Sequence, residues 1–321
     1  MKKIKIISLV CMAVILIGAL FAYFYVKTGE FTGDDWDENC AFSLDSVIDF
    51  TVKGENAKII QISDLHFAAM FGRLNEKNYA MLDAVLEKEQ PDLVVVTGDL
   101  NIALFNGPML ERFGKYMDEK KVYWAYSLGN HDYQFGYGAY NYIKKLSEFK
   151  YCLYKIGPTN LGTYLNYFIR VLNCNGEVIS TLSILNNGNS YISDNLKKWY
   201  RYNIEGLNNA HGKKIENLMF VHIPFENLHK YSSIANEKIS IMKNDNDIVS
   251  VIEELDTTHN VFSGHDHLNN FSVVENNVAY HATPSFGFCG YGKTTIERGL
   301  RVIEIADEIK ITLKGQSDYG F

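Results

Sequence analysis

Residues 58–99 read KIIQISDLHFAAMFGRLNEKNYAMLDAVLEKEQPDLVVVTGD, and this stretch predicts a strand, a helix and a second strand in succession. Lys58 to Ile62 and Leu93 to Thr97 are short apolar runs of the kind that forms buried strands. Between them, Glu76 to Gln90 carries an apolar stripe at helical spacing, with Asn75 as the expected N-cap. This order predicts two parallel strands joined by a right-handed crossover, which is the unit of an α/β sheet.

The alternation of strands and helices continues on both sides of this unit. A first strand is expected within Ser46 to Val52, and a second helix in Pro108 to Lys120. The second half has longer polar connections and fewer expected helices, with Asp247 to Leu255 as one candidate, so its sheet is expected to be mixed. Further strands are expected at Val122 to Leu128, Thr181 to Leu185, Leu218 to His222, Val261 to Ser263, Val278 to Ala282 and Leu300 to Ile305.

Composition places the chain among ordinary globular proteins. It has 321 residues, of which 47% are hydrophobic and 21% charged. The net charge of −7 argues against a nucleic-acid-binding surface, and an anionic substrate would have to be attracted by bound cations. The five cysteines are widely spaced and show no disulfide framework, so the redox compartment stays open.

The N-terminal segment has the pattern of a membrane anchor. Lys2, Lys3 and Lys5 precede an uncharged stretch from Ile6 to Val26, which spans ~30 Å as a helix at ~1.5 Å per residue. The basic flank predicts a cytoplasmic N-terminus and places the folded domain that follows outside the cytoplasm. A cleaved signal peptide, which would give a secreted protein, is the alternative.

The expected domain organisation follows from this assignment. Residues 1–27 form the basic flank and transmembrane helix, and residues 28–55 a polar stalk and lead-in. Roughly 290 residues follow the N-terminal segment of residues 1–27, and of these residues 56–321 form one folded domain.

Polar residues that bind metal ions follow two neighbouring strands in the first half. Asp64 and His66 are two residues apart after the first strand, so both side chains can point to one side of an extended segment. Gly98 permits a sharp turn after the second strand and exposes Asp99, whose carboxylate can bridge two cations. Each motif alone is more often a turn or a surface feature.

Three similar motifs follow later strands. Asn130, His131 and Asp132 are consecutive, His222 ends an apolar run, and His265 and His267 flank Asp266 after a glycine. Together with His66, the histidines of these motifs make five of the nine in the chain. The remaining four are expected to be surface or structural residues: His211, His229, His259 and His281.

Taken in order, the blocks D-x-H, G-D, G-N-H-D, H and G-H-x-H resemble those of the calcineurin-like metallophosphoesterases, from about residue 58 to residue 306. The resemblance implies an α/β fold in which two packed mixed β-sheets are flanked by helices. It also implies two divalent metal ions, with Mn, Fe, Zn or Mg compatible with oxygen and imidazole ligands.

The resemblance implies a role for each motif residue. Asp64, His66 and His267 would bind the first metal, Asn130, His222 and His265 the second, and Asp99 would bridge them. His131 would face the substrate as proton donor or phosphate-oxygen stabiliser, and Asp132 would orient its ring. A hydroxide activated by the two metals would attack phosphorus.

The last third is similar to small single-domain proteins related to purple acid phosphatases. The purple enzymes have a tyrosine ligand three residues after the bridging aspartate, and Ile102 stands there in this chain, so no purple colour is expected. A glycine-rich loop between Ser285 and Gly292 is expected either near the site or as a tight turn.

A phosphate ester is thus the expected substrate, most simply a phosphomonoester. A phosphodiester or pyrophosphate, nucleotide or lipid-linked, is the alternative, and a noncatalytic binding module on the same fold is a further one. The substrate-binding residues and the oligomeric state are not predicted by the sequence.

Overall fold

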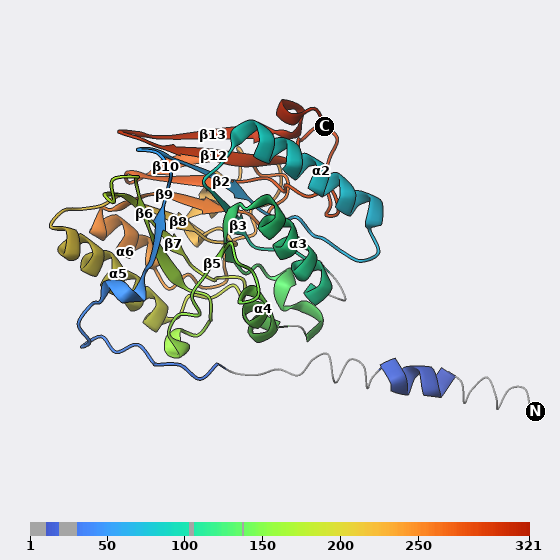
Figure 1. Ribbon diagram of the computed structural model, residues 1–321, viewed down its shortest axis with the longest axis horizontal. Coiled ribbons are helices and arrows are strands. Elements are labelled where there is room, and N and C mark those ends of the chain that lie inside the picture. The colour runs from blue at the N-terminus through green and yellow to red at the C-terminus, as the bar shows by residue number, and fades with distance from the viewer. Residues whose placement is uncertain (1–10, 19–30, 103–105, 137) are drawn as a thin grey trace, which may run out of the picture.

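The computed structural model describes residues 11–18, 31–102, 106–136 and 138–321. Two mixed β-sheets pack against each other, with α2, α3 and α4 on one side of the pair and α5 and α6 on the other (Figure 1). This is the two-sheet architecture flanked by helices that the sequence predicts.

The six-stranded sheet contains the strand–helix–strand unit of residues 58–99. Its central strands β2, β3, β4 and β5 run parallel, and the β12–β13 hairpin is added antiparallel beside β2. The strands lie in the order β13 (Ile309–Gly315), β12 (Gly299–Ile305), β2 (Ala57–Ile62), β3 (Leu93–Thr97), β4 (Tyr123–Ser127) and β5 (Cys152–Leu153).

The seven-stranded sheet is built mostly from the second half of the chain. Parallel pairing joins β7, β8, β9 and β11, and antiparallel pairs β6–β7 and β10–β11 flank them. The strands lie in the order β1 (Ile48–Thr51), β6 (Tyr167–Leu172), β7 (Val178–Ile184), β8 (Asn217–Phe220), β9 (Thr258–Ser263), β11 (Val278–Ala282) and β10 (Ser272–Glu275).

The helices bury apolar stripes against the outer faces of the two sheets. Met81, Leu82 and Phe113 from α2 and α3 join the core around β2 and β3, whereas Tyr200 and Ile252 from α5 and α6 pack with the other sheet. The helices are α2 (Gly72–Glu89), α3 (Asn106–Lys120), α4 (Gly138–Leu146), α5 (Asp194–His211) and α6 (Ile248–Leu255). Short 3-10 turns are η1 (Leu44–Ser46), η2 (His131–Gly136), η3 (Thr159–Leu161), η4 (Glu226–Tyr231) and η5 (Gln316–Tyr319).

Strand β3 shows why the apolar runs of the sequence are continuous. All five of its residues are buried, because helices cover one face of this sheet and the second sheet covers the other. Between the sheets, the rings of Phe220 and Phe262 stack with centroids 4.9 Å apart. Across the same interface, the Tyr167 hydroxyl accepts a hydrogen bond from the amide of Tyr126 at 2.9 Å and donates to its carbonyl.

Two expectations about helices are corrected. Asn75 does not cap α2, because the helix already begins at Gly72, and the buried Asn75 amide instead donates to the Ala68 carbonyl at 2.7 Å.

Helix α5 has 18 residues and was not expected. Ser193 caps it by accepting from the Leu196 amide, and its four asparagines hide the helical pattern because asparagine is a weak helix former.

The lead-in expected over residues 28–55 is part of the folded domain from well before residue 56. Strand β1 pairs in parallel with β6 at the edge of the seven-stranded sheet, and the Trp36 amide donates to Asn160 at 3.0 Å. Parallel pairing with β6 supplies the backbone partners that a free stalk would lack.

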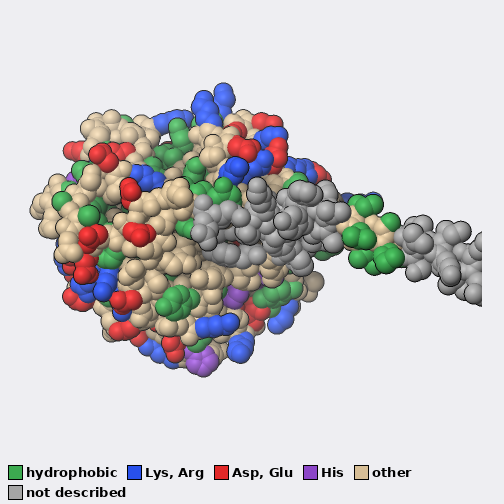
Figure 2. Space-filling view, turned by 90° about the horizontal axis from the view of Figure 1, so that it is seen from below, with side chains coloured by type: hydrophobic (Ala, Val, Ile, Leu, Met, Phe, Trp, Pro, Cys, Tyr) green, Lys and Arg blue, Asp and Glu red, His purple; other side chains and the backbone are tan. Residues whose placement is uncertain are grey.

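The predicted membrane span, Ile6 to Val26, lies mostly outside the described residues. Within it, residues 11–18 are helical with exposed side chains, which Figure 2 shows in green at the surface. In the described parts of the chain, no helix combines the length and the apolar character needed to cross a bilayer.

Candidate metal centre

Five strand ends bring the predicted motifs to one edge of the two packed sheets. Asp64, Asp99 and Asn130 follow the neighbouring parallel strands β2, β3 and β4, and His222 and His265 follow β8 and β9 of the other sheet. The carboxyl ends of adjacent parallel strands lie on one side of a sheet, so motifs distant in sequence converge there.

A first cluster is formed by Asp64, His66 and His267, whose ligand atoms all lie within 4.8 Å of one another. The Nε2 atoms of the two histidines are 2.8 Å apart, and Asp64 Oδ1 lies 3.6 Å from each. Asp64 Oδ1 is buried and has no hydrogen-bond partner. A buried carboxylate oxygen without a donor, facing two imidazole nitrogens, fits a bound cation.

A second cluster is formed by Asp99, His222 and His265. Asp99 Oδ2 lies 3.4 Å from His222 Nε2, and the amide oxygen of Asn130 lies 3.1 Å from the same nitrogen. The structure thus places Asn130 beside this second cluster, as the sequence motif predicts.

Asp99 lies between the two clusters. Its Oδ2 is 3.8 Å from His66 Nε2 and 3.9 Å from His131 Nε2, in addition to its approach to His222. Its Oδ1 accepts a hydrogen bond from the His131 amide at 2.8 Å, which fixes the direction of the carboxylate. One oxygen is therefore directed at both groups of donors.

Four of these residues have an unusual backbone conformation. Asp64, His66, Asp99 and His265 have φ values of 55°, 52°, 51° and 71°. Such left-handed conformations cost about 1 to 3 kcal/mol each for residues other than glycine, and they cluster where function requires them. Here they turn the chain sharply after a strand, so that the side chain points into the site.

Two motif glycines allow the strand ends to approach one another. A Cβ atom at Gly98, where φ is +84°, would lie 2.6 Å from His222 Nδ1 and 2.7 Å from the Gly129 Cα. A Cβ atom at Gly264 would lie 2.6 Å from Asp64 Oδ2. Both distances are too short for any side chain.

Hydrogen bonds to the far side of two rings set which nitrogen faces the site. His222 Nδ1 bonds to the Thr97 carbonyl at 2.8 Å, and His267 Nδ1 to the Tyr291 carbonyl at 3.0 Å. Each ring therefore presents Nε2 to the aspartates, as is usual for histidine metal ligands. Burial lowers the pKa of both His265 and His267 to about 4, so these rings are neutral near pH 7 and have a free lone pair.

The two buried aspartates concentrate negative charge at the site. Burial raises the pKa of Asp64 and of Asp99, but the neighbouring histidines lower both by more, so both carboxyls are ionised near pH 7. Two ionised carboxylates buried this close together are stable only with cationic partners.

The expected pairing of Asp132 with the ring of His131 is corrected. Asp132 Oδ2 accepts from the amides of Asp99 at 2.9 Å and Gly129 at 2.8 Å, so this buried carboxylate holds the backbone of two motif loops. Burial and the nearby charge of Asp99 raise the pKa of Asp132 to about 6. The His131 ring is instead bonded through Nδ1 to Gln134 Oε1 at 2.8 Å.

Asn187 is a site residue that the sequence motifs do not reveal. Its side-chain oxygen accepts from the amides of His222 at 2.9 Å and Ile223 at 3.0 Å, and its nitrogen donates to the Ile223 carbonyl at 2.7 Å. These three bonds hold the turn that carries His222. The only local signal is the pair of adjacent asparagines at 186 and 187, which follow β7 after Leu185.

The glycine-rich loop between Ser285 and Gly292 lies against the first cluster. The amides of Phe286 and Gly287 donate to the carbonyls of Ser63 and Asp64 at 2.9 and 3.2 Å. A Cβ atom at Gly290 would lie 2.5 Å from His267 Cε1. The backbone of this loop therefore packs directly against the metal-binding motifs.

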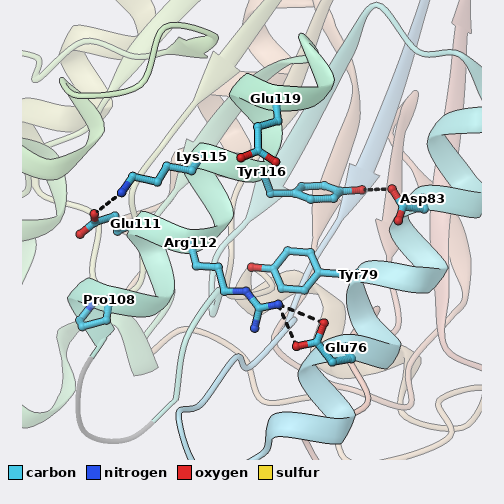
Figure 3. Close-up of a pocket in the computed structure, with 9 residues that line it drawn as sticks. All are labelled: Glu76, Tyr79, Asp83, Pro108, Glu111, Arg112, Lys115, Tyr116 and Glu119. Carbon is cyan, nitrogen blue, oxygen red and sulfur yellow. Dashed lines mark hydrogen bonds and ion pairs between the residues drawn. The ribbon is translucent and has the colours of Figure 1, made fainter.

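A separate groove of about 640 Å³ lies between α2 and α3, and none of the candidate ligands lines it (Figure 3). Several of its charged side chains form hydrogen bonds within the groove. Arg112 forms two hydrogen bonds to Glu76 at 2.8 and 3.0 Å, and the Tyr116 hydroxyl donates to Asp83 at 2.8 Å. These pairs tie the two helices together.

The two helix-flanked sheets and the aspartate and histidine clusters at their shared edge define the class of metallophosphoesterases. The chain belongs to the calcineurin-like phosphoesterase family, whose sequence profile matches residues 57–269.

Among curated proteins, relatives of this chain are purple-acid-phosphatase-like proteins of Arabidopsis thaliana. Probable inactive purple acid phosphatase 14 is 23% identical over 301 residues, which cover 77% of this chain and 74% of the relative. Probable inactive purple acid phosphatase 29 is 22% identical over 306 residues, covering 80% and 78% of the two chains.

Among solved structures, a dimetal phosphatase from Danio rerio superposes with a TM-score of 0.55 at 11% identity, covering 81% of this chain and 96% of that one. A purple acid phosphatase from yellow lupin, Lupinus luteus, gives a TM-score of 0.50 at 12% identity. The match covers 83% of this chain and 52% of the lupin protein. At these identities the likeness shows the shared fold.

Proposed function

We propose that this protein is a dinuclear metal-dependent phosphoesterase that hydrolyses phosphomonoesters. The observation that carries this proposal is the position of Asp99 Oδ2, which lies 3.4, 3.8 and 3.9 Å from the Nε2 atoms of His222, His66 and His131. A single buried oxygen shared between two groups of histidines suits a ligand that bridges two ions.

The donor set fits two divalent cations. Asp64, His66 and His267 would hold the first and Asn130, His222 and His265 the second, with Asp99 shared, and these donors suit Mn, Fe, Zn or Mg. When bound, two such ions lower the pKa of water and neutralise charge on a phosphoryl group. Ile102 stands where the purple enzymes have a tyrosine, and its side chain offers no ligand atom, so a colourless protein is expected.

His131 is positioned to act on the leaving group. Its side chain is 28% exposed, whereas that of Asp99 is 1% exposed, so His131 faces the open side of the site. Gln134 Oε1 accepts from Nδ1–H, so Nε2 is the nitrogen that faces the site, and the doubly protonated ring can donate its Nε2 proton to the departing oxygen. General acid catalysis of this kind contributes ~10²- to 10⁴-fold.

A noncatalytic binding module is the second candidate, favoured by the names of the curated relatives, which are described as probably inactive. In this chain every motif residue predicted to bind metal is present at the site. A protein that has lost turnover by losing ligands would lack one or more of them, so we favour the enzyme. Phosphodiester or pyrophosphate hydrolysis would use the same donors and is the nearest alternative reaction.

The deciding experiment measures turnover and metal content on one sample. The full-length chain, purified in detergent and supplied with Mn, should release p-nitrophenol from p-nitrophenyl phosphate and lose this activity on chelation. His131→Ala should lose most activity yet retain its metal. Protein that holds two metal equivalents but hydrolyses neither mono- nor diesters would establish the binding module instead.

We further propose that residues 6–26 anchor the protein in a membrane, with the catalytic domain outside the cytoplasm. Support comes from the uncharged stretch and its basic flank, and from the exposed apolar side chains of Val14, Ile15 and Ile17. An alkaline phosphatase reporter fused after Phe321 should be active, because it folds only outside the cytoplasm. An inactive but stably produced fusion would refute this orientation.

A further inference from the structure

Tyr291 occupies an unusual position beside the first cluster. Its ring lies parallel to that of His267, with centroids 3.9 Å apart and an angle of 9° between the planes. His267 is 4% exposed, whereas Tyr291 is 55% exposed. One face of the ring thus covers a candidate metal ligand, and the opposite face is open to solvent.

Several hydrogen bonds fix the orientation of this exposed ring. The Tyr291 hydroxyl donates to the carboxylate of Glu237, with both oxygens at 3.0 Å. The Tyr291 carbonyl accepts from His267 Nδ1 at 3.0 Å and from Arg298 Nη1 at 2.9 Å.

Glu237 is itself held in place, because its Oε1 accepts from the Leu268 amide at 2.7 Å. A side chain this exposed would normally rotate freely, and ordering it costs entropy. Tyr291 has already lost that freedom before any ligand binds, which is the condition for efficient stacking.

We propose that Tyr291 is a stacking platform that selects phosphate esters whose leaving group carries a planar aromatic ring. The proposal rests on the phosphoesterase function proposed above. The ring of Tyr291 stacks on His267, so its outer face lies beside the first cluster, where it can receive the planar group of an ester whose phosphate sits at the clusters. Offset stacking of aromatic rings favours a planar group over a saturated ring of equal size by roughly 3- to 10-fold.

The competing explanation is that Tyr291 only positions His267. A positioning residue would affect all substrates alike, because the ligand it holds serves every ester. A platform affects only substrates with an aromatic ring. The two roles are therefore separated by comparing two substrates that differ in planarity and only slightly in leaving-group reactivity, and by asking whether substitution of Tyr291 changes their ratio.

Benzyl phosphate and cyclohexylmethyl phosphate form such a pair, since both release a primary alcohol. With the full-length chain in detergent and Mn, kcat/KM should be roughly 3- to 10-fold higher for benzyl phosphate. Tyr291→Leu should abolish this preference by lowering the benzyl value more than the cyclohexylmethyl value, whereas Tyr291→Phe should keep most of it. Equal losses on both substrates in Tyr291→Leu, or no preference in the unaltered protein, would overturn the platform.

A binding measurement makes the test independent of turnover. By calorimetry, metal-loaded protein should bind benzylphosphonate roughly 3- to 10-fold more tightly than cyclohexylmethylphosphonate, and Tyr291→Leu should bind both alike. If the protein hydrolyses no ester but shows this difference, the proposed function fails and the platform stands. If it hydrolyses esters without the difference, the platform fails and the proposed function stands.

Discussion

The carboxylate of Asp132 accepts a hydrogen bond from the amide of Asp99 at 2.9 Å, across 33 residues of sequence. The same oxygen accepts from the Gly129 amide, so one buried side chain joins the loop after β3 to the loop after β4. Asp132 therefore acts on the backbone that presents Asp99, and its contribution to the site is structural.

Asp132→Asn should destabilise the protein and weaken metal binding. The amide that replaces one carboxylate oxygen is a donor, and both oxygens accept from backbone amides, Oδ2 from Asp99 and Gly129 and Oδ1 from Asn101. In either orientation of the new side chain at least one N–H is therefore left unsatisfied, at a cost of about 1 to 3 kcal/mol. Urea unfolding and metal analysis would measure both effects. Unchanged stability would show that the network can rearrange around the amide.

Gln134→Ala should separate catalysis from stability. Gln134 is bonded to His131 Nδ1 at 2.8 Å, and its loss frees the ring to rotate away from the leaving group. We expect kcat to fall on the order of tenfold, with two metal equivalents and a normal unfolding midpoint retained. A matching fall in metal content would assign Gln134 to the metal site instead.

Gly264→Ala should disrupt the first cluster. The added methyl group would lie 2.6 Å from Asp64 Oδ2, so either that side chain or the loop must move, and we expect a loss of metal and of about 2 kcal/mol or more of stability. Gly54→Ala is the matched control, since its nearest neighbour would be Asn56 O at 3.6 Å. Equal behaviour of the two variants would contradict the close packing described here.

Asn187→Ala should weaken the second cluster through the turn that carries His222. The substitution leaves the amides of His222 and Ile223 without their acceptor, with an expected loss of about 2 to 3 kcal/mol. Titration of apoprotein with Mn should show weaker binding at one of two sites. Asn189→Ala, at an exposed position, should leave the stability and the Mn binding unchanged.

His259→Gln tests a pH-dependent contribution away from the site. Burial lowers the pKa of His259, but its bonds to Glu216 at 2.6 Å and Asp256 at 3.1 Å raise it by more, so it lies above its ordinary value. The stabilisation is complete below the unfolded-state pKa of about 6.5 and is lost as the pH rises through the raised folded-state pKa.

The variant should therefore lose about 1 kcal/mol at pH 5.5 and markedly less at pH 9, measured by urea unfolding, because the pair is partly screened by solvent. His229→Gln, which changes an exposed histidine, should be as stable as the unaltered protein at both pH 5.5 and pH 9. A larger loss at pH 9 than at pH 5.5 would reverse the sign and refute the argument.

The strands were largely predictable, whereas some helices were not. Leu93–Thr97 and Val278–Ala282 have the predicted bounds, because continuous β-branched and apolar residues leave little choice but a buried strand. Helix α5 was missed because its four asparagines weaken the helical pattern, and strand β6 was missed although its sequence, YFIRVL, is apolar except for Arg170. Packing against the seven-stranded sheet supplies the stability that propensity alone does not.

The sequence by itself determined which residues are the candidate metal ligands and that each group of them follows a strand, since apolar runs and turn residues act locally. Only the tertiary structure decided which groups these residues contact. The bond between His222 Nδ1 and the Thr97 carbonyl spans 125 residues, and the approach of His66 to His267 spans 201. Such contacts depend on how two sheets align at one edge, which no local pattern encodes. For the same reason, the partners of Asp132, the turn held by Asn187 and the ring that covers His267 emerged only from the fold.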